Sequence, residues 1–267
     1  MTTTGNLTLS STGAVTQSQA ISAAGLELLG TGGTYTLTNT SNAITTLAGS
    51  TGTITLVENS GYTVGVVNTT GITTTGNVSL SSTGGITISK NITSGTGTQT
   101  YTGPITLSTG AITLTATDAN ITLSGSTTTV NGAQSLTINA GAGTVQIDGV
   151  IGATTRPLSL SIPGSGGIIL NANISTTGDQ TYSGPAELNS NVVLTTSGAT
   201  STTYSYSASV QEITISGSSF TVTLVGGAGG KGGDDGNIGM NTGVAGSYTA
   251  TVSVDPGTVI RIAPGAG

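Results

Sequence analysis

The strongest constraint on the fold is a regular alternation of small hydroxyl residues with aliphatic residues in short segments. Residues 6–9 read Asn-Leu-Thr-Leu, residues 53–56 read Thr-Ile-Thr-Leu and residues 120–123 read Asn-Ile-Thr-Leu. Alternation with period 2 places the aliphatic side chains on one face of a β-strand and the hydroxyls on the other. Glycine, asparagine or serine separates the segments. The sequence therefore predicts an all-β protein.

The distance between these segments predicts how they are arranged. Two series of positions recur in step along the chain, and each series returns at a nearly constant interval. A common period of about 23 residues is typical of a β-solenoid, in which each coil stacks its strands on the coil before it. We expect residues 1–200 to form about nine coils, about 40 Å long at about 4.8 Å per coil, with both series pointing inwards. The first series is Ile112, Leu136, Leu158 and Tyr182, and the second is Ile121, Val145, Ile168 and Val192.

The composition excludes several classes of function. The chain has no histidine and no cysteine, which excludes Ser-His-Asp triads, cysteine nucleophiles and metal sites built from imidazole or thiolate. Four basic residues and a net charge of −6 argue against binding to nucleic acid or to anionic membrane surfaces. No apolar run approaches the length of a membrane span. We therefore predict a protein that is not an enzyme, with no cofactor, no nucleic-acid partner and no membrane span.

Three parts of the repeat region resemble a known family. Residues 35–48, 71–78 and 178–185 resemble the repeats of filamentous-haemagglutinin-like large exoproteins, and the resemblance extends over about residues 1–200. It implies a right-handed parallel β-helix at the bacterial cell surface or outside the cell. Members of that family are mostly adhesins or surface filaments. The resemblance therefore implies a structural shaft that mediates attachment to an unknown surface, glycan or protein target, or that forms an extracellular filament.

The last part of the chain has a different pattern. Residues 201–267 contain a glycine-rich stretch at 226–246 and alternating segments at 220–225, 248–254 and 258–262. This pattern resembles a glycine-rich β domain found beside surface and phage-tail proteins. We expect a separate β unit here, truncated at its end. An alternative function for the whole chain is a binding module whose recognition element is this domain.

One candidate metal motif lies in that glycine-rich stretch. Residues 229–234 read Gly-Gly-Lys-Gly-Gly-Asp and match the first six positions of a Ca²⁺-binding nonapeptide. Gly236 stands where the motif requires a large aliphatic residue, and the motif occurs once, although neighbouring turns must share each ion. We therefore predict no metal site. The alternative is that Asp234 and Asp235 bind Ca²⁺.

Two other candidate sites involve the repeats themselves. Asp148 and Asp179 would form a catalytic carboxylate pair if stacking brought them together, although the interval between them does not match one coil. Outward Thr-x-Thr pairs, such as Thr53 and Thr55, would form an ice-binding or surface-binding array if all coils had one length.

A repeated motif and the ends of the predicted solenoid give the last two hypotheses. The sequence Gln-Thr-Tyr-Thr-Gly-Pro at residues 99–104 recurs as Gln-Thr-Tyr-Ser-Gly-Pro at residues 180–185. Its tyrosines, Tyr101 and Tyr182, would either stack on sugars or pack at a coil corner. The ends of a solenoid expose unpaired strands, which favours end-to-end self-association.

Overall fold

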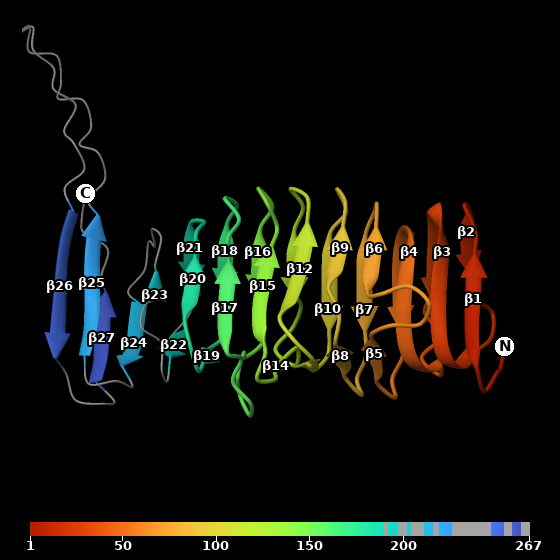
Figure 1. The fold of residues 1–267 in the computed structure, drawn as a ribbon, viewed down its shortest axis with the longest axis horizontal. Coiled ribbons are helices and arrows are strands. Elements are labelled where there is room, and N and C mark those ends of the chain that lie inside the picture. Colours follow the sequence, from red (N-terminus) through yellow and green to blue (C-terminus); the bar gives the residue numbers. More distant parts are fainter. Residues whose placement is uncertain are drawn as a thin grey trace, which may run out of the picture.

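The computed structural model describes residues 1–189 and 192–196, together with the backbone of strands at 202–203, 211–215, 219–225, 247–253 and 258–262. Figure 1 shows the strands stacked side by side along the longest axis, beginning with β1 beside the N-terminus. Pairing between the coils is parallel from β1 (Asn6–Ser10) to β22 (Val193–Thr196). The fold is therefore an all-β parallel solenoid, as the sequence predicts. Within the described residues, no helix has the length and apolar character needed to cross a membrane.

The first coils contain the longest strands. β1 pairs with the first half of β3 and β2 pairs with its second half, while β3 pairs with β4 along most of its length. The next coil divides into three short strands that all pair with β4. The strands of the first coils are β1 (Asn6–Ser10), β2 (Ala14–Thr16), β3 (Ser22–Leu37) and β4 (Ala43–Val57).

The later coils contribute their strands to three ladders, which continue the three parts of β4. The first ladder contains β5 (Tyr62–Val64), β8 (Ile86–Ile88), β11 (Ile105–Leu107), β14 (Val130–Asn131), a bridge at Ile151, β19 (Ile174–Thr176), β22 (Val193–Thr196) and β24 (Gln211–Ile215). The second contains β6 (Ile72–Thr74), β9 (Ile92–Ser94), β12 (Ile112–Ala116), β15 (Ser135–Asn139), β17 (Ser159–Ile162), β20 (Gln180–Tyr182) and β23 (Thr202–Thr203). The third contains β7 (Val78–Ser81), β10 (Gln99–Thr102), β13 (Ile121–Leu123), β16 (Val145–Ile147), β18 (Ile168–Leu170) and β21 (Ala186–Leu188).

The third ladder gives the length of each coil. Its paired positions begin at Val15 and end at Ala186, and they define nine stacked strands when β2, β3 and β4 are included. The coil that begins at Ile121 is among the longest, and the coil that begins at Ile168 is the shortest. The number of coils agrees with the prediction, but the period is less constant than the sequence suggests. The inner column is Val15, Tyr35, Ile54, Val78, Gln99, Ile121, Val145, Ile168 and Ala186.

Three members of the predicted columns, Leu158, Tyr182 and Val192, do not take the positions that the series predict. Ile112 does pair with Leu136, but the next partner in that column is Leu160, and Leu158 is 55% exposed. Leu158 lies just before β17, and Leu160, which is on β17, supplies the inner side chain instead.

The other two errors concern the ends of the two columns. Ile168 pairs with Ala186 and not with Val192, because the last coil is shorter than the others. Val192 is buried elsewhere in the core. Tyr182 is also buried, but its partner is Ile162, and Gln180 takes the position that follows Leu160.

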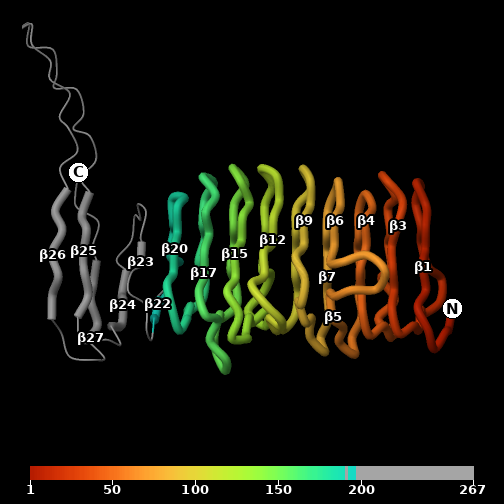
Figure 2. Tube along the Cα trace, in the orientation of Figure 1, coloured from red at the N-terminus to blue at the C-terminus, as the bar shows by residue number. Residues whose placement is uncertain are grey.

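The core is one continuous hydrophobic cluster, mostly aliphatic, that runs through the coils from Ile21 to Leu194. Figure 2 shows the chain winding around the long axis of the solenoid from its red N-terminal end to the last coils. Inner positions of the three ladders are almost wholly buried, and the positions between them are half-buried or exposed. Threonine suits these outer positions because its branched side chain favours a strand while its hydroxyl remains hydrated.

Backbone pairing continues after Thr196. β23 and β24 pair in parallel with β20 and β22, whereas β24 pairs antiparallel with β27 (Thr258–Ile262). β25 (Ser219–Val225) and β26 (Ser247–Ser253) form an antiparallel pair. Strands therefore occur where the alternating segments predict them. The glycine-rich domain and the right-handed sense of the solenoid stay predictions.

Candidate functional site

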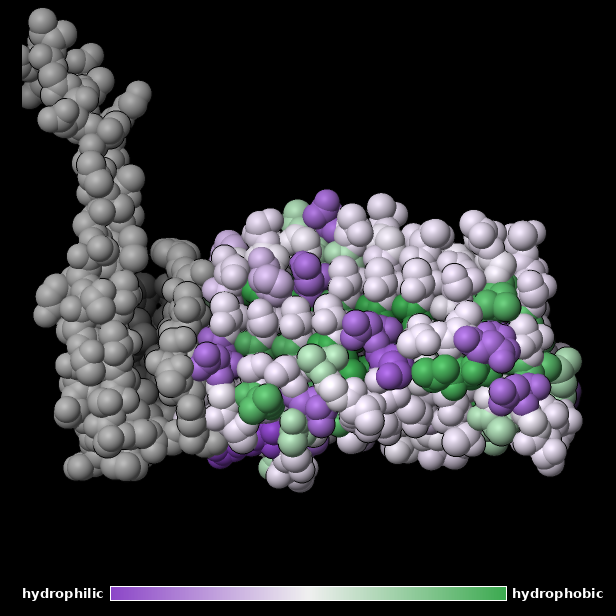
Figure 3. All heavy atoms as spheres, viewed as in Figure 1, coloured by the Kyte–Doolittle hydropathy of each residue, from purple (hydrophilic) through white to green (hydrophobic). Residues whose placement is uncertain are grey.

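Columns of outward hydroxyls cover the solenoid. In the third ladder, parallel pairing places the hydroxyls of successive coils opposite one another. Figure 3 shows one face of the solenoid, which is mostly of intermediate hydropathy with scattered hydrophilic and hydrophobic groups. Gln146, Ile169 and Glu187 occupy the same outer column in the last coils, so the hydroxyl array is interrupted. Its continuous part is Thr16, Thr36, Thr55, Ser79, Thr100 and Thr122.

The two aspartates considered for catalysis are not brought together by the fold. Asp148 follows β16 of the third ladder, whereas Asp179 precedes β20 of the second ladder. Asp148 Oδ2 accepts a hydrogen bond from the Gly125 amide at 2.9 Å, and its Oδ1 accepts one from Asn171 Nδ2 at 2.7 Å. Burial raises the pKa of Asp148, but these hydrogen bonds and one from Gln146 outweigh it, so the pKa is lowered. Asp148 therefore stabilises a coil corner.

The tyrosines of the repeated motif are enclosed by the core. Tyr101 is 0% exposed and Tyr182 is 1% exposed. Neither ring is therefore available to stack on a sugar. Both rings are buried just before the Gly-Pro corners at residues 103–104 and 184–185, which agrees with the alternative of packing at a coil corner. The side-chain amides of Gln99 and Gln180 are buried beside them and donate to main-chain carbonyls of Thr115 and Thr195.

The Ca²⁺ motif with Asp234 and Asp235 lies outside the described residues. Among the residues that the structure does describe, no three acidic, histidine or cysteine side chains are grouped as a metal site requires.

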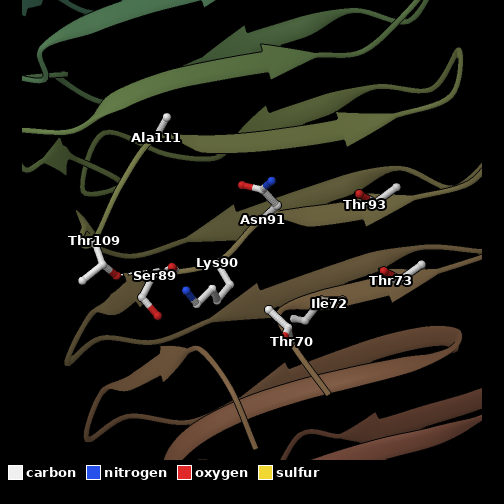
Figure 4. A pocket seen from close by; sticks show the side chains of 9 residues that line it. All are labelled: Thr70, Ile72, Thr73, Ser89, Lys90, Asn91, Thr93, Thr109 and Ala111. Carbon is white, nitrogen blue, oxygen red and sulfur yellow. Dashed lines mark hydrogen bonds between the residues drawn. The ribbon is translucent and has the colours of Figure 1, made fainter. Parts of the chain in front are cut away.

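A surface hollow of about 400 Å³ lies where three successive connections between the first and second ladders meet the second ladder. Figure 4 shows Thr73 and Thr93 side by side on β6 and β9, while Lys90 lies between Ser89 and Thr70. We call this the Lys90 hollow, after the only charged residue in its lining. The complete lining is Thr70, Ile72, Thr73, Ser89, Lys90, Asn91, Thr93, Thr109 and Ala111.

Electrostatics single out Lys90 in this hollow. The fully described part of the chain has two basic residues, Lys90 and Arg156. Lys90 is half-buried, and no carboxylate within residues 1–189 and 192–196 pairs with its ammonium. The composition contains one signal for this site, because a lysine is rare in a chain with 5% charged residues. It does not show that Lys90 lies beside a hollow.

The loop at residues 65–71 forms one side of the Lys90 hollow through Thr70. It leaves the coil between β5 and β6, and Figure 2 shows it reaching back over β4 towards β3. There Glu27, an outward residue of β3 that is 2% exposed, accepts hydrogen bonds from the Thr69 amide at 2.7 Å and from Asn68 Nδ2 at 2.8 Å. Thr8 Oγ1 of β1 donates a third bond at 2.9 Å. These contacts hold the loop against the solenoid.

The Glu27 carboxylate is buried without a cation, and its hydrogen bonds explain how it remains charged. Burial alone raises the pKa of Glu27, but the bonds from Asn68, Thr69 and Thr8 together outweigh burial and lower it. The alternation of Leu26, Glu27 and Leu28 predicts an outward position for Glu27. Nothing in the sequence indicates that a loop from a later coil covers it.

Comparison of the chain with protein-family models, curated proteins and solved structures finds no match.

Proposed function

We propose that the chain is a non-catalytic structural shaft of a bacterial cell-surface adhesin or of a secreted filamentous exoprotein. The observation that carries this proposal is the unbroken parallel register of the third ladder from Val15 to Ala186. In such an array each coil contacts only its neighbours, so the number of coils sets the length of a rod. The repeats that resemble filamentous-haemagglutinin-like exoproteins support the same role.

The character of the outer surface also favours a shaft. Charged residues make up 5% of the chain, compared with about 25% in typical globular proteins. Hydroxyls fill most outer positions of the third ladder, from Thr16 to Thr122. A hydrated, weakly charged surface suits a spacer that separates an attachment point from a cell. An extracellular or surface location follows from this role.

Intact cells of the bacterium that produces the protein provide the test. Antibodies against the 267-residue chain should label these cells without lysis, and added protease should remove the label. Labelling that requires lysis would contradict the proposal.

A deletion separates a spacer from a binding element. Removing residues 145–167 deletes one coil, because Ile168 occupies the position of Val145 in the next coil. Cells carrying this deletion should keep both surface labelling and attachment. Lost attachment with retained labelling would mean that the deleted coil is a recognition element.

A Thr-array function is the second candidate, and the outward column from Thr16 to Thr122 favours it. The unequal coils and the outer Ile169 argue against it. Thermal hysteresis of ice growth in the presence of the purified chain decides between the two functions, and a shaft should produce none.

End-to-end self-association would extend the shaft. The outer edges of β1 and β2 have no strand partner among the described residues, and Leu7, Leu9 and Val15 are only partly buried there. Unpaired strand edges of this kind favour association between chains. Sedimentation over a range of concentrations should show growing oligomers, and a monomer throughout would contradict this extension.

A further inference from the structure

The Lys90 hollow combines a cation, many neutral polar groups and backbone strain. Thr109, on one side of the hollow, has φ +57°, a conformation that a β-branched residue rarely adopts. Its hydroxyl lies 3.4 Å from the Ser89 carbonyl oxygen, which accepts its hydrogen bond. Strained residues of this kind cluster at binding sites, where the surrounding structure holds them in place.

The charge of the hollow defines the ligand's charge. The Lys90 side chain is half-buried and its ammonium pairs with no carboxylate in the described residues, so an anion would find its charge unneutralised. Hydrogen bonds to a charged group are about twice as strong as neutral ones. One cation pairs with one anionic group, which favours a ligand with a single carboxylate on each sugar residue over a doubly charged phosphate.

The remaining lining defines the rest of the ligand. Hydroxyl or amide side chains supply six of its residues, and Ile72 and Ala111 are the two aliphatic ones. Such a lining suits a compact polyhydroxyl molecule better than an apolar one. The volume of about 400 Å³ falls within the range of small-molecule sites and exceeds what a bare anion needs.

We propose that the Lys90 hollow binds a carboxylate-bearing sugar residue, with the carboxylate on Lys90 and the sugar hydroxyls on Thr73, Thr93 and Asn91. This goes beyond the role of a shaft and does not depend on it. The loop at residues 65–71 completes the site through Thr70.

Isothermal titration of the full chain with trigalacturonate and with its neutral methyl ester tests this proposal. Trigalacturonate should bind and should weaken as salt rises. The methyl ester should bind at least about tenfold more weakly, since it keeps the hydroxyls but loses the charge. No heat at about 10 mM trigalacturonate, or equal binding of the ester, would overturn the proposal.

Substitutions identify the residue that binds the charge. Lys90→Met should weaken binding at least about tenfold, whereas Lys90→Arg should restore most of it. Arg156→Met is the matched control, because Arg156 is the other described cation and lies outside the hollow. If Lys90→Met and Arg156→Met lose trigalacturonate affinity equally while both keep the wild-type melting temperature, the assignment of the site to the Lys90 hollow is wrong. Inorganic phosphate that competes as well as trigalacturonate would show a simple anion site and overturn the sugar assignment.

Thr109 gives a separate test of the strained turn. Glycine adopts positive φ without a steric penalty, so Thr109→Gly should leave the melting temperature unchanged or raise it. It also removes the hydroxyl that holds Ser89, so trigalacturonate should bind more weakly. Unchanged binding would overturn the assignment of Thr109 to the site.

Discussion

The hydroxyl of Tyr101 donates a 2.6 Å hydrogen bond to Gln99 Oε1 in the interior of the solenoid, where both residues are fully buried. Gln99 Nε2 in turn donates to the Thr115 carbonyl at 2.6 Å and to Ser94 Oγ at 3.1 Å. The same pair recurs one motif later, where Tyr182 donates to Gln180 at 2.9 Å. The repeated motif therefore builds a polar layer inside an aliphatic core.

The Gln99–Tyr101 pair should show strong coupling. Gln99→Leu leaves the Tyr101 hydroxyl and the Thr115 carbonyl without their partner, and should cost about 2–4 kcal/mol of unfolding free energy. Tyr101→Phe leaves Gln99 Oε1 unsatisfied and should cost about 1–3 kcal/mol. The double variant should lose less unfolding free energy than the sum of the two single variants. Each single variant leaves the polar group of the remaining partner buried without a hydrogen bond, and the double variant removes both groups. Urea unfolding measures all three.

The outward neighbour Thr100 is the matched control for this cycle. Thr100→Val should change the unfolding free energy by less than about 0.5 kcal/mol. Strictly additive losses for Gln99→Leu and Tyr101→Phe would show that the two side chains do not depend on each other.

Adjacent residues of β13 should respond very differently to one new charge. Ile121 is 0% exposed and packs between coils, so Ile121→Asp places an unpaired carboxylate among aliphatic side chains and should cost about 4 kcal/mol or more. Thr122 points outwards, and Thr122→Asp should cost less than about 1 kcal/mol. Thermal unfolding followed by circular dichroism compares the two variants. Similar shifts in melting temperature would contradict the assignment of inside and outside.

The sequence predicted the ladder architecture well but located the register less well. Period-2 alternation is the same for Leu158, Leu160 and Ile162, so it cannot choose which residue follows Leu136 into the core. The length of the turn at residues 152–158 determines the register, because it leaves Leu158 exposed and places Leu160 in the core opposite Leu136.

Small residues and tertiary contacts explain what else the sequence did not reveal. Ala186 takes the position after Ile168, but an alanine gives little hydrophobic signal in the sequence. Glu27 and Lys90 acquire their surroundings from loops in other coils. Such contacts depend on the exact length of each turn, which a repeat with coils of unequal length does not fix.

The glycine of the repeated motif should be essential for stacking. Gly103 has φ +108°, and a Cβ there would lie 1.8 Å from the Ser82 carbonyl oxygen. Gly110 has φ +81°, but a Cβ there would meet nothing within 4 Å. Gly103→Ala should therefore cost more than about 3 kcal/mol, whereas Gly110→Ala should cost about 1–2 kcal/mol from backbone strain alone. If Gly103→Ala and Gly110→Ala lose the same unfolding free energy in urea, the backbone at Ser82 moves away from the new Cβ at little cost.

Glu27 should link stability to the position of the loop at residues 65–71. Glu27→Gln keeps the size of the side chain but replaces one acceptor oxygen with an amide donor. That donor faces the Thr69 amide if it takes the place of Oε1, or the donors of Asn68 and Thr8 if it takes the place of Oε2. The expected cost is about 1–3 kcal/mol at neutral pH. Hydrogen exchange should also show faster exchange of the Thr69 amide in this variant. Unchanged exchange would mean that other contacts hold the loop.

The difference in unfolding free energy between wild type and Glu27→Gln should depend on pH, and this dependence tests the role of the charged Glu27 carboxylate. Its pKa is lowered in the folded protein, so it contributes stability that is fully present above the unfolded pKa of about 4.3 and is lost as pH falls through the folded pKa. The groups that face it are Thr8, Asn68 and Thr69, and none of them is charged. The advantage of wild type over Glu27→Gln should therefore shrink as the pH falls from about 5 to about 3 in urea unfolding. Asp148 titrates in both proteins and cancels from the comparison. An advantage that stays constant over this range would show that the loop does not depend on the charged form of Glu27.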